Sequence, residues 1–131
     1  MLEAHGASRI LASFHDIAPN WIFAGLYFPD TYLAAKGEVV QKVIAGLAKS
    51  FAFIKANEAK ARTFIPKYTK IDPEISRICA LRAYGSPKEP LERIYAQQKL
   101  MVQYGYLQKR VEIEHMIDYR YVDAVMGAKT N

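Results

Sequence analysis

Between about Glu38 and Lys55, apolar residues recur at steps of three and four positions, which places them along one stripe of a helix. Lysines at positions 42, 49 and 55 lie off this stripe. The pattern predicts a long amphipathic helix, the longest of the chain or close to it. The stripe residues expected to be buried are Val40, Val43, Ile44, Leu47 and Phe51.

Capping residues predict further helices downstream. Asn57, Asp72 and Asp118 are candidate N-terminal caps, and Gly105 and Gly127 are candidate C-terminal stops. The predicted helices are Glu58 to about Tyr68, Pro73 to about Tyr84, Leu91 to about Tyr104, and a last helix through Met126.

Two segments before the long helix are predicted strands. Ser8–Phe14 mixes β-formers with small residues, and Trp21–Phe28 is apolar nearly throughout, which is typical of a strand buried on both faces, although periodicity does not exclude a buried helix. Residues 111–116 form a strand or an extended link. Because such strands need neighbours, the sequence predicts a helix-rich α/β fold with an incomplete sheet. This is either a mainly helical domain with a small sheet or part of a larger α/β protein.

Composition narrows the function classes. The 131 residues suffice for one domain, and 51% are hydrophobic. The net charge of +5 permits binding to anions, but the 18 basic residues are spread through the chain, so we predict no nucleic-acid partner. The first residues lack the pattern of a secretory signal, which predicts a cytoplasmic location for the chain as written, and no apolar run is long enough to span a membrane.

The residues that could carry chemistry are scattered. Cys79 is the only cysteine and has the spacing of a buried helical residue, and the three histidines lie far apart. Glu112, Glu114 and His115 are close in sequence, but in a strand the histidine would face away from the glutamates. No phosphate-binding loop or nucleophile motif is present. We therefore predict no catalytic residues, no metal and no cofactor, and hence no enzyme.

The order of several segments resembles a known family. These segments are "ASRILASFHDIAPNWIFAGLYF", "EVVQKVIAGLAKSFAFIKAN", "EAKARTF" and "LMVQYGYLQKRVEIEHMIDYRYVDAVM". Together they resemble the solute-binding proteins of bacterial ABC importers, in the nitrate, sulfonate, taurine and thiamine-precursor branch. The short matches are Ile54-Lys55-Ala56-Asn57, Gly105-Tyr106-Leu107 and Ile117-Asp118.

The resemblance implies the C-terminal portion of a type II periplasmic binding protein fold, which has two lobes. Residues 1–14 would end lobe two, residues 15–28 would form the crossover at the hinge, and residues 29–131 would complete lobe one with helices. The missing strands would lie in an absent N-terminal part, so the chain would be a fragment or half of a split protein.

The resemblance also implies a function in solute import. Asp16, Asn20 and Trp21, in the crossover, are the candidate substrate-binding residues, although Asp16 and Asn20 are also ordinary turn residues. The ligand would be a small molecule such as nitrate, a sulfonate, taurine or a pyrimidine precursor, bound only once the missing part is supplied. The partner would be an ABC permease and the location periplasmic. A pyrimidine-precursor synthase of related fold is a further, enzymatic alternative.

An alternative of another class is a helical protein–protein interaction module without a transport role. If the chain is a fragment, its incomplete sheet leaves apolar surface uncovered, whereas a self-sufficient helical domain would be a stable monomer. We therefore predict a homodimer or larger oligomer, with Trp21, Phe23 and Phe28 near the contact.

Overall fold

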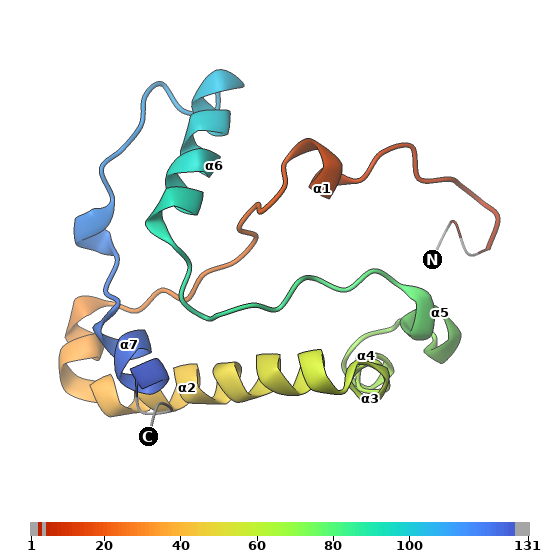
Figure 1. The fold of residues 1–131 in the computed structure, drawn as a ribbon, viewed down its shortest axis with the longest axis horizontal. Helices are drawn as coiled ribbons and strands as arrows, with labels where there is room; N and C mark the ends of the chain where they lie inside the picture. Colours follow the sequence, from red (N-terminus) through yellow and green to blue (C-terminus); the bar gives the residue numbers. More distant parts are fainter. Residues whose placement is uncertain (1–2, 4, 128–131) are drawn as a thin grey trace. The chain divides into compact units, whose positions relative to one another are not determined.

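The computed structural model describes residue 3 and residues 5–127, and it is 56% helical (Figure 1). One helix is far longer than the others, and extended segments connect the rest. The helices in chain order are α1 Phe14–Ile17, α2 Asp30–Ala56, α3 Glu58–Arg62, α4 Ile65–Tyr68, α5 Pro73–Ile78, α6 Leu91–Gln103, the 3₁₀ helix η1 Glu114–Met116, and α7 Arg120–Gly127.

The predicted long helix is confirmed as α2, which has 27 residues and begins earlier than predicted, at Asp30. Its N-terminal part is kinked at Lys36, whose backbone dihedrals (φ −135°, ψ 29°) are not helical. The predicted stripe is only partly buried. Val40 is buried, Val43 is 42% exposed, and the other three are only half-buried (Ile44, Leu47 and Phe51), so the predicted burial is confirmed for Val40 alone.

The prediction of an α/β fold is wrong, because the described residues form no strand and no sheet. Residues 8–13 lead into α1 and residues 21–29 lead into α2, and neither segment forms a helix, a strand or a turn. A β-prone composition favours extended backbone, but a strand also needs a second backbone to pair with. The structure is therefore not a type II periplasmic binding protein fold.

Two helix predictions are shortened for identifiable reasons. The helix predicted from Glu58 to Tyr68 is divided into α3 and α4, because Pro66 has no N–H to continue the hydrogen-bond ladder. The helix predicted to reach Tyr84 ends at Ile78, and the next residue, Cys79, has extended dihedrals. Asn57 and Asp72 do stand at the N-termini of α3 and α5, as predicted.

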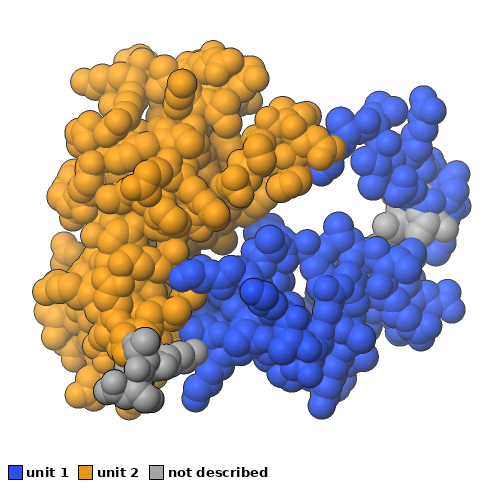
Figure 2. All heavy atoms as spheres, viewed as in Figure 1, with its two compact units in different colours: residues 1–13, 47–86 blue, residues 14–46, 87–131 orange. Residues whose placement is uncertain are grey.

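The described residues divide into two compact units (Figure 2). Unit 1 comprises residues 1–13 and 47–86, and unit 2 comprises residues 14–46 and 87–131. Each unit is thus built from segments that are discontinuous in sequence, and α2 contributes residues to both.

In unit 1, α3 and α4 both pack against α5. Ile75 and Ser76 of α5 are buried. The rings of Phe51 and Tyr84 lie 5.3 Å apart, between the C-terminal half of α2 and the extended segment that follows α5.

Unit 2 is organised around α6, from which two adjacent glutamines bind extended segments. The side-chain amide of Gln97 accepts from the N–H of Ile22 at 2.8 Å and donates to its carbonyl at 3.4 Å. Gln98, which is buried, accepts from the N–H of Val111 at 2.8 Å. These side chains provide the partners that a neighbouring strand would otherwise supply to the extended backbone.

Two tyrosine hydroxyls hold α7 and the residue before it within unit 2. The Tyr121 hydroxyl donates to the carbonyl of Leu33 at 3.3 Å, three residues before the kink of α2 at Lys36. The Tyr119 hydroxyl, just before α7, donates to the carbonyl of Glu89 at 2.5 Å. Val122 is the buried apolar residue of the helix.

Candidate functional site

The residues predicted to bind a substrate lie together around the turn that joins α1 to the extended segment of unit 2. Asp16 is exposed within α1, and Asn20 is exposed with a left-handed backbone (φ +61°) that asparagine tolerates better than most residues. Trp21 is half-buried, and its ring meets the ring of Phe14 edge-on at 5.4 Å. These positions are typical of a turn and of local aromatic packing. Whether the three residues bind a ligand stays a prediction.

No cluster of histidine, cysteine and carboxylate side chains that could hold a metal ion occurs among the described residues. Glu114 and His115 belong to the short 3₁₀ helix η1 and not to a strand.

The Tyr95 ring, in α6, stacks on the Arg110 guanidinium at 3.6 Å, and its hydroxyl donates to a Glu112 oxygen at 3.3 Å. Burial, together with the hydrogen bond to Glu114, raises the pKa of Tyr95 above its ordinary value of 10.0.

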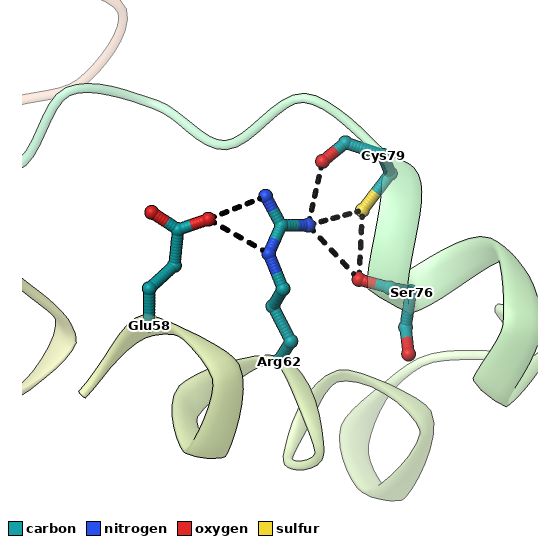
Figure 3. A network of polar contacts seen from close by, with 4 residues as sticks. All are labelled: Glu58, Arg62, Ser76 and Cys79. Atoms are coloured by element: carbon teal, nitrogen blue, oxygen red, sulfur yellow. Dashed lines mark hydrogen bonds and ion pairs between the residues drawn. The ribbon is translucent and has the colours of Figure 1, made fainter.

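Arg62 joins α3 to the end of α5 in unit 1 (Figure 3). Its Nη1 donates to the carbonyls of Ser76 at 3.0 Å and Cys79 at 2.7 Å, while Nε and Nη2 donate to Glu58 at 2.9 and 2.8 Å. The last carbonyls of a helix lack partners within it, and a cation there also suits the helix dipole. Arg62 therefore terminates α5 and fixes the position of α3 and α4.

That arrangement forms one wall of an apolar groove of about 440 Å³ in unit 1. Phe53 and Phe64 lie at its floor, with ring centroids 6.2 Å apart, and they are 37% and 38% exposed. Lys67 extends over the Phe64 ring, with Nζ 5.2 Å from the centroid. The residues that line the groove are Lys49, Ser50, Phe53 and Ile54 from α2, Ala61 from α3, and Phe64.

The net positive charge of the protein resides in the same unit. Unit 1 contains nine lysine and arginine residues against four aspartates and glutamates, whereas unit 2 contains nine of each. Of the acidic residues of unit 1, Glu58 forms an ion pair with Arg62. The whole formal charge of +5 is therefore carried by unit 1, and two of its lysines, Lys49 and Lys67, lie at the groove.

Much apolar surface is exposed in both units. Among the described residues, five hydrophobic residues are buried, while nineteen large ones are exposed. The chain exposes 10654 Å². Two separate compact domains of the sizes of the units, about 6 and 9 kDa, would together expose only about 8,400 Å². The excess of about 2,200 Å² exceeds the roughly 800 Å² that one protein contributes to a standard interface.

Two features of the sequence indicate the groove, and neither belongs to the apolar stripe that predicted α2. Phe53 lies off the stripe of α2, so the run Phe51-Ala52-Phe53-Ile54 is apolar on more than one face. Residues 47–86 hold eight basic and three acidic residues, a local excess that is hidden when the charge is considered over the whole chain. Counting charge by segment would have found it.

Comparison of the chain with protein-family models, with curated proteins and with solved structures finds no match in any of the three. The resemblance to solute-binding proteins of ABC importers therefore stays a prediction. Within the described residues, no helix is both long and apolar enough to cross a membrane.

Proposed function

We propose that the chain is a helical protein-interaction module that completes its hydrophobic core against a protein partner. The observation that carries this proposal is the total exposed surface, which is larger than compact domains of these sizes leave to water, together with the nineteen large hydrophobic residues that are exposed among the described residues. Burial of apolar surface is the main favourable term in protein association. A chain that leaves so much of it uncovered gains stability by binding.

The extended segment of unit 2 is the clearest example of such surface. Phe23, Leu26 and Tyr27 are 59%, 54% and 91% exposed within residues 21–29. Extended backbone of this kind can add a strand to a partner's sheet or can pair with a second copy. The predicted homodimer, with Trp21, Phe23 and Phe28 near its contact, is one form of this proposal.

Import of a small solute is not the function that we propose. Solute capture of that type depends on closing two lobes over the ligand, and the described residues have no sheet from which such lobes are built. The absence of enzymatic activity stays a prediction.

The proposal is tested first on the purified chain. We expect the chain alone to bind 1-anilinonaphthalene-8-sulfonate and to unfold in urea with a low m-value, because little additional surface becomes exposed on unfolding. Sedimentation at micromolar concentration then shows whether a second copy is the partner. A monomer with the steep urea transition of a compact 131-residue protein and no dye binding would refute the proposal.

The second test locates the interaction in the cells that make the protein. Benzoylphenylalanine at Tyr27 should form one discrete protein adduct on irradiation, whereas the same group at Arg120, whose side chain is 85% exposed in a polar setting, should not. The partner identified in the adduct, once purified, should raise the urea midpoint of the chain. No adduct at Tyr27, or equal labelling at both positions, would contradict the proposal.

A further inference from the structure

The groove of unit 1 combines an apolar floor with a basic surrounding. Phe53 and Phe64 are more than a third exposed, and Lys49 and Lys67 lie beside them. Among the described residues, the groove is lined by α2 and by the α3–α4 segment, and it is open to solvent. A small ligand would not be covered there, since pockets for small molecules bury most of the ligand surface.

We infer that this groove binds an acidic amphipathic helix of another protein. An amphipathic helix would place apolar side chains at i, i+3 or i+4, and i+7 on Phe53 and Phe64. Its flanking carboxylates would face the lysines of the rim, and the positive charge of unit 1 would favour the encounter. This inference rests on the proposed function and specifies the surface and the chemistry of the partner.

The charge distribution also indicates that the occupant is not a second copy of this chain. No described helix longer than four residues carries a net negative charge, so the chain itself offers no acidic helix to the groove. Unit 2, with equal numbers of acidic and basic residues, has no net negative charge to complement unit 1. The partner is therefore a different protein with an excess of aspartate and glutamate.

The test uses the full chain and three fluorescein-labelled 18-residue peptides. The first has leucines along one helical face and glutamates elsewhere, the second replaces every glutamate with lysine, and the third scrambles the first to remove its apolar face. Fluorescence polarisation should show binding of the first peptide that weakens with salt. We expect the second and third peptides to bind at least about tenfold more weakly.

Substitutions at the rim locate the site without altering the apolar floor. Lys49→Glu with Lys67→Glu should weaken binding of the acidic peptide at least about tenfold and should favour the lysine peptide instead. Lys99→Glu with Lys109→Glu makes the same change in charge at exposed positions of unit 2, and it should leave binding nearly unchanged. Circular dichroism confirms that each variant retains its helices.

Other ligand classes are outcomes of the same experiment. Equal binding of the acidic and lysine peptides overturns the inference. Binding to vesicles of anionic phospholipid or to a 20-nucleotide DNA, with no binding of the acidic peptide, overturns it in favour of a lipid or nucleic-acid surface. If the acidic peptide does not bind while the dye binding and the Tyr27 adduct persist, the inference about the groove is refuted and the proposed function is not. A compact monomer without an adduct would instead refute the proposed function.

Discussion

Gln97 binds both backbone groups of Ile22, accepting from its N–H at 2.8 Å and donating to its carbonyl at 3.4 Å. A single side chain thereby replaces the two hydrogen bonds that a neighbouring strand would make. The prediction of a strand at Trp21–Phe28 is wrong, and a helix and not a sheet provides the partner for this segment of backbone.

Replacement of Gln97 by alanine should destabilise unit 2. Both groups of Ile22 are partly buried, and each loses its partner, so we expect a loss of about 1–3 kcal/mol in the free energy of unfolding. Urea denaturation measures it. Gln103→Ala, at the exposed C-terminal end of the same helix, is the matched control and should change stability by less than about 0.5 kcal/mol. Equal effects of the two substitutions would show that the contact to Ile22 contributes nothing.

A second prediction separates the two roles of Arg62. Arg62→Ala removes the donors to the carbonyls of Ser76 and Cys79 and should cost about 1.5–3 kcal/mol, since the donor is charged and its side chain is only 16% exposed. Glu58→Ala removes only the ion pair between residues four apart and should cost about 0.5 kcal/mol or less. The free energy of unfolding is again the measurement. A larger loss from Glu58→Ala would mean that the ion pair, and not the termination of α5, is what matters.

The third prediction concerns acid. The hydrogen bond from Arg120 lowers the pKa of Asp118 below its ordinary value of 3.8. A carboxyl whose pKa is lowered by folding adds stability above its unfolded pKa, and this contribution is lost as the pH falls through the folded pKa. Asp118→Asn, which keeps the oxygen that accepts from the Arg120 N–H, should therefore lower the urea midpoint at pH 7.

The difference between wild type and Asp118→Asn should begin to close as the pH falls below about 3.8 and should vanish once the pH is below the lowered pKa of folded Asp118, because that side chain is then also uncharged. Denaturation midpoints between pH 7 and pH 2.5 measure this. A difference that is constant over the whole range would assign the effect to packing and not to charge.

The fourth prediction tests the close approach of α7 to α2. A Cβ added at Gly37 would lie 3.0 Å from Cε1 of Tyr121, so Gly37→Ala crowds that ring. With Tyr121→Ala in the background, the same change should stabilise the protein by about 0.5–1 kcal/mol through helix propensity. In the wild-type background the gain should shrink or reverse. A double-mutant cycle measures the coupling, and strict additivity would show that the two residues do not touch in solution.

The sequence predicts the helices well where the signal is local. The apolar stripe of α2, the caps Asn57 and Asp72, and the stop at Gly105, whose φ is +76°, are all features of a few neighbouring residues. The end of α5 was not predicted correctly, because it depends on a residue that lies well before it in the chain. Arg62 donates hydrogen bonds to the carbonyls of Ser76 and Cys79, which are 14 and 17 residues away in sequence.

The sheet and the site could not be predicted in the same way. Ser8–Phe14 and Trp21–Phe28 have the composition of strands, but pairing depends on whether another backbone is available, and no local pattern reports this. The groove brings Phe53 and Phe64 together across the turn between α2 and α3, so it becomes visible only once the helices are placed. The excess of basic residues in this part of the chain, in contrast, can be counted directly in the sequence of residues 47–86.

The contact between Gln97 and Ile22 spans 75 residues, which sets a delay during synthesis of the chain. At about 5–20 residues per second, Ile22 is made about 4–15 s before its partner on α6 exists. During this interval the apolar segment around it has neither a sheet nor a helix to hold it. Most of unit 1, by contrast, is the continuous stretch 47–86 and can assemble as it leaves the ribosome. The nascent chain is therefore exposed to aggregation and to chaperone binding at a segment that still has exposed apolar side chains in the finished protein.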